Sequence, residues 1–150
     1  MPPKPKAYEA LSAIADKRLT LVSETAARVV SSDGSKTYTV KWTEDGSMFS
    51  ANDNASYWQG YMGYPLIATL MTLGRLTFKP EIASHLAGIP WKKLNAKYKR
   101  DYNKAVEHVL CEREAAGFSR AAIEAEVDFI YAQLGTLAIE RGTAAGMPPR

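Results

Sequence analysis

The sequence has few of the residues that build disulfide frameworks, zinc clusters or membrane spans. It has one cysteine, Cys111, among 150 residues, which excludes an internal disulfide and a cysteine-rich zinc site. Its longest apolar run, Leu66–Leu73, is far shorter than the roughly 20 residues that a membrane helix requires. The first residues also lack the apolar segment of a signal peptide. We therefore expect a cytoplasmic protein that has no contact with a membrane.

The motifs of the common enzyme classes are missing as well. The chain contains no P-loop, no G-x-G-x-x-G and no G-x-S-x-G. His85 falls in a short predicted helix, and His108 lies beside Glu107 and Glu112 in a long one, with Cys111 on nearly the same side. Residues about one turn apart on a helix rarely form a substrate cleft. We predict no catalytic residue, no cofactor and no metal, and an enzyme of unknown reaction is the least favoured function.

Composition and charge are those of a globular domain with one basic segment. Hydrophobic residues make up 46% of the chain and charged residues 23%. The net charge is +3, and residues 79–104 hold 7 Lys and Arg against 2 Asp and Glu. Residues 105–150 hold 4 against 7, so the C-terminal part is acidic. This asymmetry fits a contact with nucleic acid, and it equally fits two packed helices of opposite charge.

The first half of the chain reads as a β-meander. A helix at Ala7–Lys17 follows a loose tail at Met1–Lys6, and alternating apolar residues with Gly-containing turns come next. The predicted strands are Leu19–Ser23, Ala27–Ser32, Lys36–Trp42 and Met48–Ala51. The residues expected on the core face are Val22, Val29, Tyr38, Val40 and Trp42.

The second half reads as helices. Apolar spacings of three and four, Pro at helix starts and Gly at helix ends mark four segments. They are Leu66–Leu73, Pro80–Leu86, Trp91–Ala116 and a helix capped by Ser119 that ends at Gly142, before a frayed tail. The last two form a long helical hairpin. We predict one α+β domain over residues 1–150, with the meander at 19–51, an aromatic loop at 52–65 and helices at 66–142.

The aromatic loop is the first candidate site. Its rings, Tyr57, Trp58, Tyr61 and Tyr64, alternate with amides and an acid around Asn52–Asn54. Tyr and Trp concentrate at binding surfaces and stack on exposed bases. The same rings could instead cover the junction between the sheet and the helices, with the Asx side chains satisfying turn backbone.

The layout of residues 36–76, a hairpin, a polar loop and an apolar helix, resembles the SWIM zinc-finger module. In that family a Cys-x-Cys pair and a Cys-x-His pair bind zinc. The matching positions here are Phe49 and Ala51, then Gly63 and Pro65, so all four zinc ligands are lacking. The resemblance implies a metal-free module in which aromatic packing replaces the ion. SWIM modules are associated with binding of nucleic acids and proteins.

The second candidate site is a basic stripe on the long predicted helix. Lys93, Lys97, Arg100 and Lys104 are spaced four, three and four apart, and Lys92 and Lys99 widen the stripe. Cations spaced along one helical face can follow a phosphate backbone. A solvated helix surface would have the same pattern.

We therefore expect a small non-catalytic binding module. The leading partner is nucleic acid, bound by phosphate contacts to the basic stripe and by stacking on the aromatic loop. The alternative is a protein–protein subunit that uses the aromatic loop and the acidic C-terminal helix. Nothing in the sequence indicates an oligomeric state.

Overall fold

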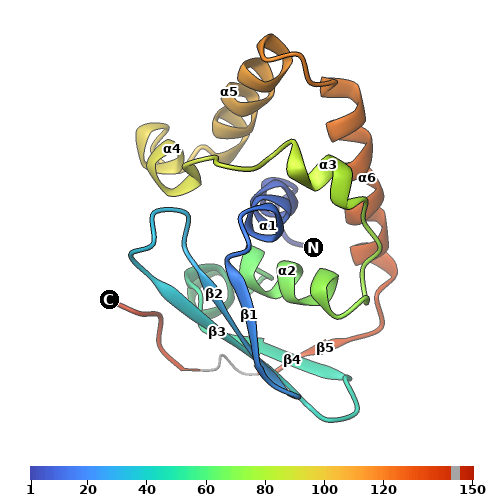
Figure 1. The fold of residues 1–150 in the computed structure, drawn as a ribbon. Helices are drawn as coiled ribbons and strands as arrows, with labels where there is room; N and C mark the ends of the chain where they lie inside the picture. The colour runs from blue at the N-terminus through green and yellow to red at the C-terminus, as the bar shows by residue number, and fades with distance from the viewer. Residues whose placement is uncertain (143–145) are drawn as a thin grey trace.

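A five-stranded sheet and a set of helices make up residues 1–142 and 146–150, which the computed structural model describes. The α+β class predicted from the sequence is confirmed (Figure 1). The predicted C-terminal tail is described only in part, since residues 143–145 lie outside the described residues. The elements are α1 (Pro5–Ala15), β1 (Leu19–Ser23), β2 (Ala26–Val30), β3 (Thr37–Trp42), β4 (Met48–Ala51), η1 (Ala55–Gln59), α2 (Tyr64–Thr72), α3 (Pro80–Ser84), α4 (Trp91–Lys97), α5 (Tyr102–Ala115), α6 (Arg120–Thr136) and β5 (Glu140–Arg141).

The sheet follows the predicted meander and adds one strand. Its order is β1-β2-β3-β4-β5, and the pairs from β1 to β4 are antiparallel. β5 pairs parallel with β4, with Met48 opposite Glu140. The sequence predicted helix up to Gly142, but α6 ends at Thr136 and the chain returns to the sheet edge. A strand of two residues is too short to show the apolar–polar alternation from which strands are predicted.

One face of the sheet packs on α2, which in turn packs on α1. Val29 and Val40 are fully buried there, as predicted, whereas Tyr38 and Trp42 are half-buried. The prediction for Val22 was wrong, because its side chain is 44% exposed. The pairing of β1 with β2 shifts between Leu21 and Ser23, so Val22 lies at an irregularity where alternation no longer predicts the face.

α1 is the central helix of the molecule (Figure 1). It contacts α2, α3, α5 and α6, and its residues from Pro5 to Ala13 are buried. The predicted loose tail was therefore wrong from Pro5 onward, where proline occupies the first turn and needs no N–H partner. Pro2 is also held, because the Tyr131 hydroxyl donates to its carbonyl oxygen at 2.7 Å.

The long helix predicted from Trp91 to Ala116 is broken in two. α4 ends at Lys97, and α5 begins at Tyr102 after Asp101, whose carboxylate accepts from the Lys104 N–H at 3.2 Å. Between them Lys99 and Arg100 take positive φ angles of 52° and 66°. The apolar residues that one long helix would have placed on a single face therefore belong to two separate helices.

The hairpin of α5 and α6 forms as predicted. Gly117 ends α5 with a φ of 96°, and the Ser119 hydroxyl accepts from the Ala122 N–H at 3.1 Å as the cap of α6. No helix in residues 1–142 and 146–150 combines the length and apolar character that a membrane crossing requires.

Candidate ligand pocket

A pocket of about 520 Å³ opens between α1, the β2–β3 end of the sheet, η1 and the junction of α4 with α5. Figure 1 shows α4 directly above the turn that joins β2 to β3, with η1 behind the sheet. The volume lies within the range of about 300–1,000 Å³ that is typical of small-ligand sites. The first lining residue along the chain is Lys6 and the last is Tyr102, so the pocket joins segments that are far apart in the sequence.

η1 supplies the outer wall of the pocket. It is a π-helical turn, a conformation that occurs often at functional sites. The buried Asp53 carboxylate holds its start by accepting from the Ser56 N–H at 3.2 Å and the Ser56 hydroxyl at 2.7 Å. Gly60 ends it with a φ of 74°. The indole of Trp58 stands at this wall with 65% of its surface exposed.

Aromatic rings cover much of the remaining lining. Of the predicted loop residues, Trp58, Tyr61 and Tyr64 line the pocket, and Tyr57 packs edge-on against Trp58 outside the lining, 4.6 Å between ring centroids. Tyr64 begins α2, and burial raises its pKa well above the ordinary value. It meets the ring of Tyr38 edge-on at 6.2 Å.

A buried ion pair from α1 forms part of the lining. Lys6 Nζ lies 3.2 Å from Glu9 Oε2, and both side chains are less than a tenth exposed. Glu9 Oε2 has no hydrogen-bond partner among the described residues, whereas Glu9 Oε1 accepts from Asn95 Nδ2 at 3.1 Å. The Lys6 ammonium also lies 4.0 Å from the centroid of the Tyr102 ring.

The charge of Lys6 is kept in spite of burial. Burial by itself lowers the pKa of Lys6, but attraction to Glu9, with smaller contributions from Tyr102 and Tyr61, outweighs it. The net pKa is above the ordinary 10.5, so the pocket contains a fixed ammonium at neutral pH.

Arg18 adds a second enclosed cation. Its Nη1 donates to the Val30 carbonyl oxygen at 2.7 Å, and its Nε lies 3.4 Å from Asp16 Oδ2. Its guanidinium carbon is 5.8 Å from the centroid of the Tyr64 ring. These contacts hold the guanidinium between the end of β2 and the aromatic lining.

The predicted basic stripe is not one stripe, because the break after α4 separates its members. Lys92 and Arg100 line the pocket, whereas the other four cations lie outside the lining. Lys92 is anchored to the β2–β3 turn, with Nζ 3.4 Å from Asp33 Oδ2. Hydrogen bonds from Ser35 and Ser31, with Lys92 nearby, hold the pKa of Asp33 well below its usual range.

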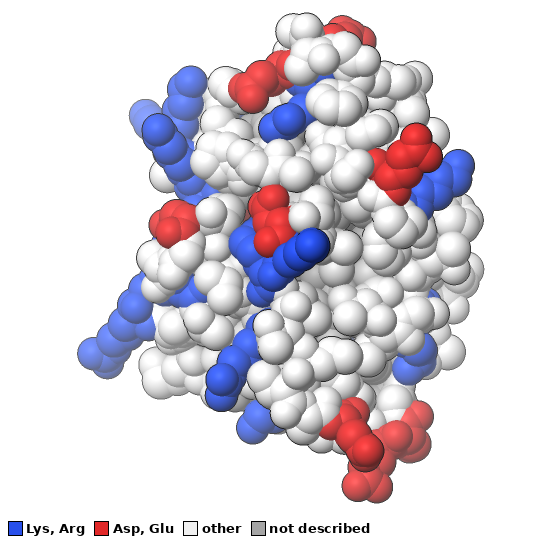
Figure 2. Space-filling model, in the orientation of Figure 1, with Lys and Arg blue, Asp and Glu red and all other residues white. Residues whose placement is uncertain are grey.

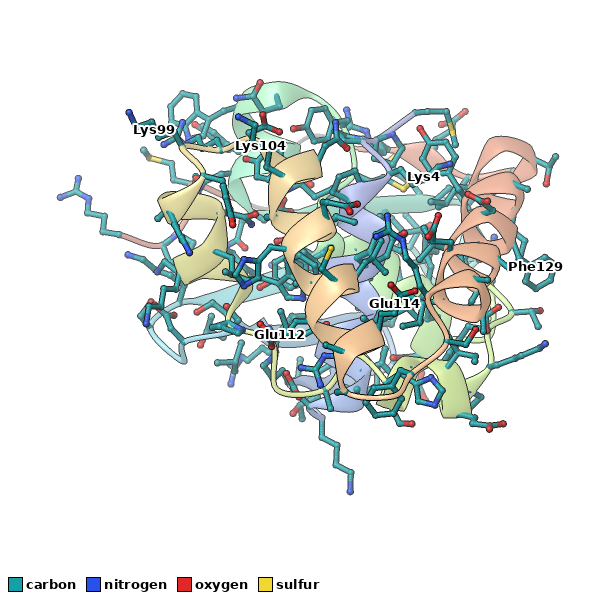
Figure 3. All side chains as sticks on the ribbon, turned by 90° about the horizontal axis from the view of Figure 1, so that it is seen from above. Lys4, Lys99, Lys104, Glu112, Glu114 and Phe129 are labelled. Atoms are coloured by element: carbon teal, nitrogen blue, oxygen red, sulfur yellow. The ribbon has the colours of Figure 1, made fainter. Side chains whose placement is uncertain are left out.

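The cations outside the lining still gather on one side of the molecule. Figure 2 shows Lys and Arg side chains over α4, and Figure 3 places Lys99 and Lys104 together near the α4–α5 junction. Within residues 1–142 and 146–150, no ion pair joins the segment Lys92–Lys104 to α6. The acids of α6 pair elsewhere, Glu124 with Arg120 and Asp128 with Lys4.

The histidines and the cysteine lie outside the pocket lining. His108 Nδ1 is 2.9 Å from the Tyr98 hydroxyl, and its Nε2 is 3.3 Å from Glu112 Oε2, which ties the end of α4 to α5. Cys111 is exposed on α5. Among the residues that the structure describes, no group of three or more His, Cys, Asp or Glu could hold a metal ion.

Several lining residues were missed by the sequence analysis. Lys6 was assigned to a loose tail, Tyr102 fell inside the predicted helix Trp91–Ala116 with no site assigned, and Arg18 was assigned to no site. The spacing of Lys6 and Glu9, three apart on a helix, was an available signal for the ion pair. No local sequence pattern marked Asn95 as a pocket residue, because its hydrogen-bond partner Glu9 lies 86 positions away.

One family model spans nearly all of this architecture. It is described as Uncharacterised conserved protein UCP014422, and it matches residues 1–140. The chain belongs to the UCP014422 family. No curated protein and no solved structure gives a match. All of the pocket-lining residues lie within the part of the chain that matches UCP014422. The match gives no information on zinc binding, so the resemblance to SWIM modules stays a prediction.

Proposed function

We propose that this protein is a non-catalytic module that binds single-stranded nucleic acid by holding one nucleotide in the pocket. The observation that carries the proposal is the meeting of Arg100 and Lys92 with Trp58 and Tyr61 around one cavity of about 520 Å³. Rings of this kind stack on unpaired bases, and cations at the same opening neutralise the phosphate.

The shape of the site favours a single strand over a duplex. The pocket is walled by η1 on one side and by α4 on another, so a base must leave its stack to enter. Trp58 is exposed at the wall and available for a second stacked base. Lys99 and Lys104 lie outside the lining near the α4–α5 junction, where they can attract the phosphates of neighbouring nucleotides.

A fluorescence-anisotropy titration with labelled single- and double-stranded oligonucleotides at two salt concentrations tests the proposal. We expect the single strand to bind more tightly and its affinity to fall steeply with salt. Arg100→Glu should weaken binding about tenfold or more at low salt and make the log–log salt dependence shallower by about 0.7.

Lys97→Glu is the matched control, since Lys97 carries the same charge on α4 but lies outside the pocket lining. We expect it to change affinity by no more than about twofold, because exposed charges away from the ligand are screened by salt. Equal losses for the two variants would favour a diffuse basic surface over the pocket. Absence of oligonucleotide binding at low salt would overturn the proposal.

The exposure of Trp58 favours one second candidate, a protein contact. An indole that is 65% exposed is typical of the anchors of protein interfaces. Glu124 and Asp128 of the acidic helix pair within the chain, as Lys92 of the pocket does with Asp33, so ion pairing does not separate the two candidates. A complex that persists at high salt and is lost on Trp58→Ala would support this candidate.

A further inference from the structure

Four tyrosines line the pocket: the Tyr64 ring lies against the Arg18 guanidinium, and the hydroxyls of the other three have no hydrogen-bond partner among the described residues. Tyr98 and Tyr131, outside the pocket, donate or accept within the protein at 2.9 and 2.7 Å. Like those of Tyr8 and Tyr57 outside the lining, the hydroxyls of Tyr38, Tyr61 and Tyr102 make no hydrogen bond to any residue in 1–142 or 146–150. Each of the last three side chains is half-buried and lines the cavity.

These three hydroxyls belong to side chains that line one cavity. The buried side-chain atoms without a hydrogen-bond partner do not include these three oxygens, so each oxygen is accessible. Tyr102 and Tyr61 both act on the Lys6 ammonium and raise its pKa. The pKa of Tyr38 is raised first by burial and then by Asp53, Asp33 and Glu9. The three tyrosines and the ion pair of Lys6 and Glu9 line the same cavity, and the Lys6 ammonium lies 4.0 Å from the centroid of the Tyr102 ring.

A ligand that enters the pocket must replace the water that solvates these hydroxyls. A purely apolar surface would leave them desolvated and unpaired, which is costly. A hydroxyl group is the matching partner, because it can both donate to and accept from a tyrosine hydroxyl. In a nucleotide that lacks the ribose 2′-hydroxyl, one such group is missing at the part that joins base to phosphate.

We infer that Tyr38, Tyr61 and Tyr102 bind the ribose hydroxyls of the nucleotide in the pocket, so that the partner is RNA and not DNA. This inference rests on the proposed function. Arg100 and Lys92 hold the phosphate, Trp58 stacks on a base, and the three tyrosine hydroxyls meet the sugar between them. A site built to hydrogen-bond a hydroxyl discriminates against the analogue without it, because its own polar groups are then left unpaired.

The test compares an RNA oligonucleotide with the DNA of the same sequence, uridine replaced by deoxyuridine, in anisotropy titrations at one low salt concentration. We expect the RNA to bind about tenfold more tightly, the size of one well-placed hydrogen bond. A 2′-fluoro oligonucleotide, which cannot donate from that position, should bind like the DNA. Equal affinity for RNA and DNA, both lost in Arg100→Glu, would overturn the inference and leave the proposed function intact.

Tyr61→Phe and Tyr102→Phe remove the hydroxyls and keep the rings. Each should reduce the RNA affinity several-fold toward that of the DNA while the DNA affinity stays unchanged. Tyr57→Phe is the matched control, since Tyr57 lies on η1 beside Trp58 but outside the lining, and it should change neither affinity.

Circular-dichroism melts establish that each variant is folded. If Tyr102→Phe does not fold, Tyr61→Phe decides together with the wild-type comparison. An unchanged RNA-to-DNA ratio in the folded variants would contradict the assignment of these hydroxyls. If neither oligonucleotide binds the wild-type protein, the proposed function fails and the inference fails with it.

Discussion

Gly63 shows how one residue without a side chain shapes the pocket wall. A Cβ at this position would overlap Asp53 Oδ2 and lie 2.7 Å from Asp53 Cγ. The Asp53 carboxylate is buried and holds the start of η1 through Ser56. The close approach of Gly63 therefore lets the aromatic wall begin where it does.

We expect Gly63→Ala to lower the free energy of unfolding by about 1–3 kcal/mol, the usual cost of overpacking a buried site. Urea denaturation followed by circular dichroism measures it. Gly135→Ala is the control, because Gly135 is an exposed position of α6 where a Cβ would meet only Met1 Cε at 3.9 Å. That change should raise the free energy of unfolding by about 0.5–1 kcal/mol. A Gly63→Ala protein of wild-type stability would mean that Asp53 does not hold η1.

At the scale of elements, the break between α4 and α5 decides which cations reach the pocket. Lys99 and Arg100 adopt left-handed backbone with φ of 52° and 66°. For side chains with a Cβ this costs roughly 1–2 kcal/mol per residue. The burial of Trp91 and Leu94 on α4, together with the Asp101 cap of α5, offsets that cost.

Lys99→Gly tests the break directly. Glycine removes the strain of the left-handed backbone in the folded state, and it also raises the conformational entropy of the unfolded chain. The first effect should be the larger, so we expect the free energy of unfolding to rise by roughly 0.5 kcal/mol. Lys93→Gly, on the exposed side of α4, should instead lower it by about 1 kcal/mol. Similar losses in the two variants would indicate one continuous helix, as the sequence pattern predicted.

The same break shows where sequence reasoning succeeds and where it stops. The strands were predictable because alternation and turn glycines such as Gly34 are local signals. The break was not, since no Gly or Pro interrupts the apolar spacing from Trp91 to Val109 and tertiary packing overrides it.

The candidate site divides in the same way. Trp58, Tyr61 and Tyr64 were found from a dense aromatic segment, and they do line the pocket. Lys6 and Arg18 were not found, because what makes them pocket residues is the approach of α4 and η1 from distant parts of the chain. The spacing of residues in the sequence does not predict that these distant elements lie close together in the fold.

At the scale of the whole molecule, α1 joins the sheet side to the helical side and buries ionisable groups. Tyr8, 5% exposed, has its pKa raised from 10.0 to about 12 by burial, with Glu124 and Asp128 adding to the effect. Burial also raises the pKa of Tyr38 and of Tyr64. In the folded protein these phenols therefore keep their protons to higher pH than in the unfolded chain.

The free energy of unfolding should consequently be at its full value below pH 10 and decrease as the pH rises from about 10 to about 12. In that window the unfolded chain loses the phenolic protons that the folded state still retains. Urea denaturation at a series of pH values measures the effect. Tyr8→Phe keeps the ring and removes the proton, so its decrease should be shallower. An identical decrease in the variant would contradict the assigned role of Tyr8.

The three tryptophans differ sharply in their surroundings. Trp91 is 2% exposed and donates to the Ser12 hydroxyl, Trp42 stacks on Phe49, and Trp58 is 65% exposed at the pocket wall. A dissolved quencher such as acrylamide will therefore extinguish the emission of one indole well before the other two. The protein contains its own optical reporter of pocket occupancy, and ligands can be screened on the wild-type chain without any attached dye.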